Sequence, residues 1–171
     1  MEVVKAPDQK LRIKTKPVKK VTSAILNTLK QMVKLTKTFK DPEGVGLAAT
    51  QVGLEDRFFV AKNGEKFVSV INPKIISTSK RTKTYFEGCL STPNIWGEVK
   101  RHTGIKVSYL DPSGKTVTQP LKGVLAWIFQ HEIDHLDGIL FQDRVLEQKG
   151  TFYKFTGKDK TGTDMFEEIT I

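Results

Sequence analysis

His131, Glu132 and His135 match the pattern H-E-x-x-H, in which two histidines stand four residues apart and a glutamate follows the first. On a helix, residues four apart lie on one face, so both imidazoles can bind the same metal ion. Glu132 lies about 100° around the helix from His131, so its carboxylate can reach a water at the metal without itself becoming a ligand. This spacing indicates the centre of a metal-dependent hydrolase.

A chance match on a solvent-facing helix is the alternative explanation of this pattern. The segment 122–136, however, is apolar on nearly every side of a helix, with Val124, Leu125, Trp127, Ile128, Phe129, Ile133 and Leu136. Two buried imidazoles beside a carboxylate are costly unless something pairs them. We therefore expect a helix that runs through the core and holds a metal, with Gly138 at its C-terminal cap.

A catalytic metal needs a third protein ligand if one position is to stay open for water. His102, in the run KRHTG, fits a surface position at a strand end or turn better than a ligand. Cys89, the one cysteine of the chain, stands in EGCLSTP after Gly88, where the backbone can pack closely. A thiolate would also remove one of the two charges of the metal. A buried apolar thiol is the alternative for Cys89, and composition by itself favours it.

The elements around this helix predict an α+β domain. A first amphipathic helix begins with Thr22 or Ser23 as its N-cap and ends before Asp41. Strands are predicted at 57–61, 66–76, 98–102, 105–110 and 116–121, the last two forming a hairpin. Residues 151–171 are expected to form a terminal β-hairpin, and residues 1–171 are expected to be one domain.

The composition excludes several classes of protein. The net charge is +9, but the 28 Lys and Arg are spread along the chain without interleaved aromatic residues, so no specific nucleic-acid site is expected. No apolar run approaches the roughly 18 residues of a membrane span, and residues 1–20 lack the apolar core of a secretory signal. One cysteine suits a reducing compartment. We expect a cytoplasmic protein without membrane contact.

A further segment, GVGLAATQVG at 44–53, places two glycines within three residues and implies an unusual backbone or a close approach to another group. Alone, it fits a turn or helix entry in which small alanines aid packing. Together with EGCLS at 87–91 and QHEIDHLDG at 130–138, in this order, it gives the chain a close resemblance to peptide deformylase, from about Val4 to Arg144.

The resemblance implies the peptide deformylase fold, with antiparallel and mixed sheets packed round the central helix. It also implies removal of the formyl group from the N-terminal formyl-methionine of new polypeptides, with release of formate. N-formyl-methionyl peptides are then the partners, and a metal-bound water attacks the formyl carbonyl. The roles that carry over are metal ligation by Cys89, His131 and His135, acid/base catalysis by Glu132, oxyanion donation by Gln51 and the backbone N–H of Leu90, and substrate contact by Gly46.

The metal implied by the resemblance is Fe²⁺. Zinc usually outcompetes ferrous iron for such ligands, so occupancy depends on availability and geometry, and Zn²⁺, Ni²⁺ or Co²⁺ can also occupy the site. Beside it, Val124, Trp127 and Ile128 lie on the helical face of His131, where they are expected to form an apolar wall for the methionine side chain. An ordinary helix core would show the same three residues.

The chain also departs from the family pattern in two places. Trp96 stands where family members often carry an arginine, seven residues after the cysteine, which leaves contacts beyond the first substrate residue open. The predicted strand pair at the C-terminus replaces the basic helix that bacterial members use at the ribosome, so docking there by that route is not supported. Glu87 and Arg101 fit either a simple surface pair or a brace for the cysteine loop.

The residues alone are also compatible with two other functions. A zinc metallopeptidase would take its third ligand downstream of the helix, for example from Asp137 or Asp143, but would leave EGCLS without a role. A non-catalytic relative that kept only the fold would need neither Glu132 nor Gln51. Both alternatives predict no release of formate from a formylated peptide.

Overall fold

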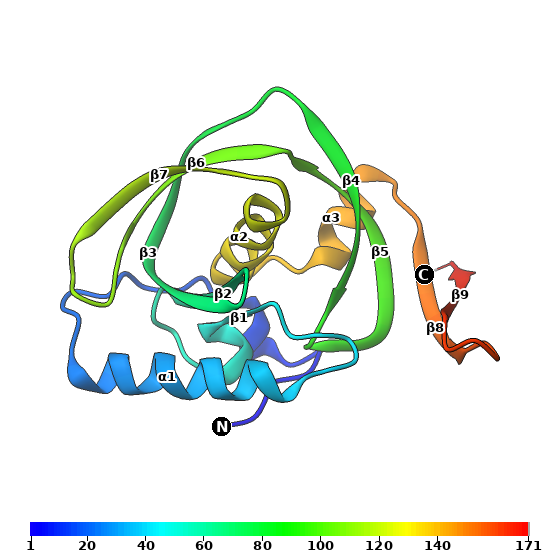
Figure 1. Ribbon diagram of the computed structural model, residues 1–171, viewed down its shortest axis with the longest axis horizontal. Helices are drawn as coiled ribbons and strands as arrows, with labels where there is room; N and C mark the ends of the chain where they lie inside the picture. Colours follow the sequence, from blue (N-terminus) through cyan, green and yellow to red (C-terminus); the bar gives the residue numbers. More distant parts are fainter. Residues whose placement is uncertain (171) are drawn as a thin grey trace.

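The computed structural model describes residues 1–170, which form two antiparallel sheets around a central helix (Figure 1). The strands of the first sheet are β1 (Gly46–Ala48), β2 (Phe58–Asn63), β3 (Lys66–Thr78), β6 (Gly104–Leu110) and β7 (Thr116–Lys122). The strands of the second are β4 (Thr82–Cys89), β5 (Thr92–His102), β8 (Phe152–Lys158) and β9 (Asp164–Ile169). The helices are η1 (Gln9–Arg12), α1 (Ser23–Thr38), η2 (Ala49–Val52), α2 (Gly123–Leu136) and α3 (Phe141–Gln148). The predicted α+β class is confirmed.

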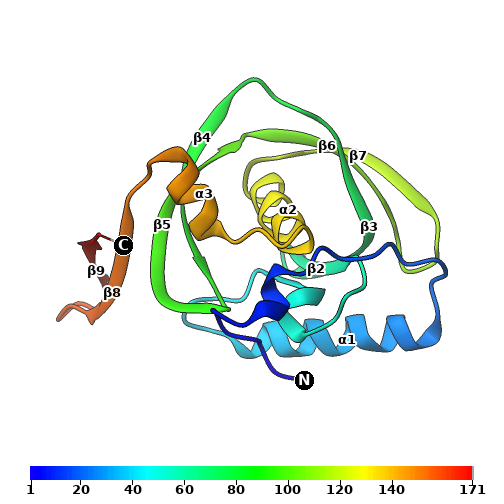
Figure 2. The same ribbon diagram turned by 180° about the vertical axis from the view of Figure 1, so that it is seen from behind.

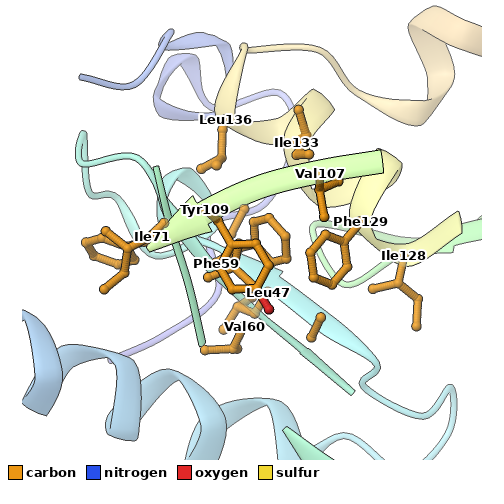
Figure 3. Close-up of a cluster of buried hydrophobic side chains, with 14 of the residues drawn as sticks. Leu47, Phe59, Val60, Ile71, Val107, Tyr109, Ile128, Phe129, Ile133 and Leu136 are labelled. Atoms are coloured by element: carbon orange, nitrogen blue, oxygen red, sulfur yellow. The ribbon is translucent and has the colours of Figure 1, made fainter. Parts of the chain in front are cut away.

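The central helix α2 lies between the sheets in both ribbon views (Figures 1 and 2), and almost all of its residues from Ala126 onward are buried. Phe129 packs edge-on against Phe59 of β2, with ring centroids 5.0 Å apart. Figure 3 shows Phe129, Ile133 and Leu136 of α2 among the side chains of the first sheet. The helix therefore runs through the core, as its all-round apolar sequence predicts.

Gly138 lies just after the end of α2 at Leu136. Its φ of +74° is a left-handed conformation that glycine adopts without strain, and its N–H donates to the carbonyl of His135. A Cβ at this position would also lie 2.5 Å from the carbonyl oxygen of Arg12, so the N-terminal segment passes directly over the helix end.

The first helix, α1, begins where the sequence predicts. The hydroxyl of Thr22 accepts a hydrogen bond from the backbone N–H of Ile25, which satisfies one of the free donors of the first turn. Leu29 and Met32, one turn apart, are its buried apolar residues, and they pack into the core beside the first sheet.

Several short elements were not predicted, including η1, β1, β4 and α3. α3 is only eight residues long, and its buried side chains are Phe141 and Val145, which is too little apolar pattern to reveal a helix. β4 has mostly exposed or half-buried side chains, so it lacks a clear apolar alternation. α3 packs against β5, where a Cβ at Gly97 would lie 2.6 Å from Val145.

The C-terminal hairpin consists of β8 and β9, which pair with each other, while β8 also pairs with Ile95, Trp96 and Gly97 of β5. The predicted strand-like tail is confirmed, and residue 171 lies outside the described residues. None of the helices within residues 1–170 is long and apolar enough to cross a membrane.

Candidate metal centre

The side chains of Cys89, His131 and His135 meet at one point in the core. α2 supplies the two histidines from one face, and Cys89 comes from the end of β4, where the strand reaches the helix. The Sγ of Cys89 lies 3.2 Å from Nε2 of His135, and one potential ligand atom of each residue lies within 4.8 Å of the others. This arrangement suits a tetrahedral metal with one position left open, because the protein supplies three ligands.

The surroundings fit a bound metal. Nδ1 of His131 is hydrogen-bonded to Oε2 of Glu87 at 2.9 Å, which leaves Nε2 as the ligand atom. Among residues 1–170, the buried polar atoms without a hydrogen-bond partner include Oε2 of Glu132 and Nδ1 of His135. Unpaired buried polar groups are rare, and the free Oε2 of Glu132 beside the ligand cluster indicates a place for a water or another bound group. Nδ1 of His135 lies on the other side of its ring from the nitrogen that contacts Cys89, so it is not the ligand atom. Thiolate and imidazole together are ligands that suit zinc or iron.

The carboxylate of Glu87 braces the site from behind. It is fully buried and accepts hydrogen bonds from Nε and Nη2 of Arg101 at 2.8 and 3.0 Å and from Nε1 of Trp127 at 2.8 Å. Burial raises the pKa of Glu87, but the hydrogen bonds from His131 and Arg101 outweigh it and lower that pKa to about 2. Glu87 therefore stays ionised and orients His131, and it is a brace rather than a surface pair with Arg101.

The brace continues away from the metal. Nη1 of Arg101 donates to Asp134 at 2.5 Å, and Nη2 of Arg144 on α3 donates to the same carboxylate at 2.7 Å. Arg101 is 6% exposed, so its charge is compensated almost entirely within the protein. The chain of ion pairs ties α2, α3 and the second sheet to the metal ligand His131.

Glu132 stands beside the ligands with its carboxylate buried. A Cβ placed on Gly46 of β1 would lie 2.3 Å from its Oε1, so only glycine at this position leaves room for the carboxylate. Burial raises the pKa of Glu132 to about 7. A buried carboxyl with a pKa in this range can both accept and return a proton near neutral pH.

The amide of Gln51 is held in one orientation by η2. Its Oε1 accepts a hydrogen bond from the backbone N–H of Ala48 at 2.9 Å, so Nε2 faces Ser91 Oγ at 3.1 Å and Cys89 Sγ at 3.3 Å. The side chain is 1% exposed. A fixed N–H donor thus lies beside the metal ligands, where it can bind an oxygen atom of a substrate.

A cavity of about 190 Å³ opens onto this cluster. Of the residues singled out from the sequence, it is lined by Gly46, Gln51, Cys89, Leu90, Trp127, Ile128, His131 and Glu132. Val124 is not brought there, because it lies on the first turn of α2 and is 62% exposed. His102 also lies away from the metal ligands, with Nδ1 2.7 Å from the carbonyl oxygen of Ser79.

The cavity has walls that the sequence patterns did not reveal. Pro42, Glu43 and Val45 come from the segment before β1. Trp96 of β5, which the sequence marked only as a departure from the family pattern, lines the cavity as well. The two glycines around Val45 were the available signal, since they indicated a close approach of the backbone to another group. Trp127 has two roles in the structure, because it lines the cavity and also donates to Glu87.

Comparison with known proteins identifies the family. The model of the polypeptide deformylase family matches residues 1–150. The peptide deformylase of Thermotoga neapolitana is 44% identical over 142 residues, which are 83% of this chain and 85% of that protein. The crystal structure of peptide deformylase from Thermotoga maritima has a TM-score of 0.79 and 41% identity, and the match covers 84% of this chain and 95% of that one.

A peptide deformylase from Synechococcus elongatus, solved in complex with actinonin, has a TM-score of 0.80 and 35% identity, covering 84% of this chain and 78% of that chain. The matched region contains the three metal-ligating residues and the buried glutamate between them. The chain therefore belongs to the peptide deformylase family and is a metal-dependent hydrolase that removes N-formyl groups.

Proposed function

We propose that this chain deformylates new polypeptides that begin with formyl-methionine, with Glu132 as the group that moves the proton. The observation that carries the proposal is the buried carboxylate of Glu132 beside the Cys89, His131 and His135 cluster, at the end of a cavity that admits a small group. Burial of a carboxylate that lacks full hydrogen bonding costs free energy. A role in proton transfer at the reacting carbonyl would explain why the chain has a buried carboxylate here.

Cys89, His131 and His135 would hold the metal, which we propose is Fe²⁺ in the cell. When bound, a divalent metal lowers the pKa of water and polarises a carbonyl oxygen. The protein holds the thiol and one imidazole in contact beforehand, and Glu87 fixes the ring of His131. A reducing compartment is part of the proposal, because oxidation of Cys89 would remove a ligand.

Glu132 takes a proton as the formyl carbon is attacked and delivers it to the amine that leaves. Gln51 and the backbone N–H of Leu90 would stabilise the negative charge that develops on the formyl oxygen. The hydrogen bond from Ala48 directs the side-chain amide of Gln51 toward Cys89, so an N–H donor lies beside the ligands before substrate binds, and a substrate oxygen would take the place of Cys89 Sγ or Ser91 Oγ as its acceptor.

The apolar part of the cavity would hold the methionine side chain. Trp127 and Ile128 from α2, with Val45 and Leu90, are among the apolar residues that line it. An apolar cavity with few polar groups at one end is typical of a site that orients a small substrate. Gly46 would contact the substrate. Because it has no side chain, it also leaves room for the carboxylate of Glu132, which a Cβ at this position would meet.

The metallopeptidase alternative finds no support in the geometry. Asp137 is paired with Arg57 at 2.8 Å, and Asp143 is paired with Arg12 and accepts from the N–H of Leu140. Both carboxylates are thus engaged elsewhere, whereas Cys89 lies at the histidines. Docking at the ribosome through a terminal helix is likewise not part of the proposal, because the tail forms β8 and β9.

The test is release of formate from formyl-Met-Ala by protein purified without oxygen, with the metal content measured on the same sample. Activity on unformylated Met-Ala measures peptidase action. Glu132→Ala should retain metal and lose about 10²- to 10⁴-fold in kcat, with Glu132→Gln as the isosteric control. Full activity of Glu132→Ala, or a metal-loaded wild type that is inert on formyl peptides, would contradict the proposal.

A further inference from the structure

A second cavity, of about 330 Å³, lies next to the metal-site cavity. The two share Pro42, Cys89, Leu90 and Trp96 as lining residues. When the formyl-methionine of a substrate occupies the metal-site cavity, the residues that follow it must extend toward the protein surface. The second cavity adjoins the first and is large enough to hold them. Its lining therefore meets the substrate after the methionine.

The outer wall of this second cavity comes from the C-terminal hairpin. Phe155 and Lys158 of β8 and Asp164 of β9 line it. In Figures 1 and 2 the turn between β8 and β9 lies at the same end of the second sheet as the turn between β4 and β5. The family model matches residues 1–150, so this wall lies outside the residues that the model matches.

Aromatic contacts fix the hairpin in this position. Phe166 of β9 packs edge-on against Phe86 of β4, with centroids 4.9 Å apart, and against Trp96 of β5 at 5.5 Å. Phe155 packs against Phe166 at 5.8 Å. Phe155 and Trp96 thus both contact Phe166, in the cluster that attaches the hairpin to the sheet, and both line the cavity.

An ion pair closes the wall on the other side. Nζ of Lys158 lies 2.9 Å from Asp41, in the loop after α1, and 2.5 Å from Asp164. The hairpin is therefore connected across the cavity to the segment that also supplies Pro42. Since Lys158 is compensated by two carboxylates, it does not leave an isolated charge for a ligand.

The chemistry of the lining selects the ligand. Phe39, Pro93, Ile95, Trp96 and Phe155 are apolar, while Lys5 is occupied by the carbonyl oxygen of Leu90 at 2.7 Å. We infer that the β8–β9 hairpin is a specificity wall of this deformylase, in which Phe155 and Trp96 favour formyl-Met peptides with large apolar side chains at the second and third residues. The inference rests on the proposed function and deepens it.

The experiment compares kcat/KM for formyl-Met-Phe-Phe and formyl-Met-Ser-Ser. The wild type should prefer the first peptide by about tenfold, mainly through KM, because burial of aromatic surface is the source of the preference. In Phe155→Ala this ratio should fall to about two. Met165→Ala is the matched control, since Met165 lies on the same hairpin, is 42% exposed and does not line the cavity, and its ratio should stay at the wild-type value.

The outcomes separate the two proposals. An equal kcat/KM of the wild type for both peptides overturns the inference without any variant, as does a ratio in Phe155→Ala that remains tenfold. Turnover of formyl-Met-Ala in the same experiment shows that deformylation is intact when the preference is absent. No turnover of formyl-Met-Ala by metal-loaded wild type overturns the proposed function and the inference with it.

Discussion

Replacement of Arg101 tests the brace behind the metal site most directly. Arg101→Met replaces the guanidinium with an apolar side chain of similar length. The substitution removes the hydrogen bonds to Glu87 at 2.8 and 3.0 Å and the one to Asp134 at 2.5 Å. Arg101 is 6% exposed and Glu87 is fully buried, so water cannot replace these bonds. Asp134 keeps Arg144, whereas Glu87 keeps only the neutral indole N–H of Trp127 and the ring of His131.

The expected loss in the free energy of unfolding is about 3–5 kcal/mol, the usual cost of removing one partner of a buried ion pair. For a chain of 171 residues, each kcal/mol corresponds to about 2–4 °C in Tm, so Tm should fall by about 6–20 °C. Urea unfolding of metal-free protein is the assay, because a metal that binds only the folded state would mask part of the loss.

The matched control is Lys16→Met, which removes the pair between Lys16 and Glu55, whose side chains are 78% and 54% exposed. An exposed pair of this kind is screened by solvent, so little change is expected. Adding Glu87→Gln to Arg101→Met should recover part of the loss, because the stranded charge is then removed. If Arg101→Met is no more destabilised than Lys16→Met, the reasoning is refuted.

Three further predictions concern the metal site itself. Gly46→Ala should retain metal but lose about 100-fold or more in kcat, because the new Cβ would displace Oε1 of Glu132; metal analysis and formate release check both parts, and near-normal turnover would contradict the role of this contact. Gln51→Leu should lower kcat by about 10²- to 10³-fold with metal content unchanged, measured on formyl-Met-Ala, and a loss seen only in KM would argue against oxyanion stabilisation. Glu87→Gln should weaken metal binding by about 10- to 100-fold in a chelator competition, and unchanged affinity would show that Glu87 does not orient His131.

The catalytic helix could be predicted in detail from the sequence, since its chemistry follows from one local periodicity. His131 and His135 fall on one face because of the i, i+4 spacing, and the apolar residues around them required burial. Cys89 could not be placed in this way, because its position depends on the pairing of β4 and β5. Its residue type and its position after Gly88 made it a candidate third ligand, and the resemblance to a known family then supported its connection with the helix.

The brace shows where sequence reasoning reached its limit. Whether Glu87 and Arg101 form a surface pair or a buried one depends on the faces of β4 and β5 that turn inward, and β4 was not predicted. The same limit applied to α3, whose Arg144 completes the ion pairs through Asp134. On half-buried strands, the sequence pattern does not show whether a charged side chain contacts solvent or forms a buried ion pair.

The buried polar groups of α2 explain why the site lies where it does. Gln130 is satisfied by the backbone of His102, His131 by Glu87, and Asp134 by two arginines, as buried polar groups generally are. Among residues 1–170, Glu132 and His135 are the two members of this helix that each retain a buried polar atom without a partner. Folding has thus compensated the supporting groups and one ring nitrogen of the ligand His131, and it has left Oε2 of Glu132 free beside the metal ligands. This difference separates a catalytic centre from a structural polar core, and it is why Glu132→Ala should leave the protein folded while it removes turnover.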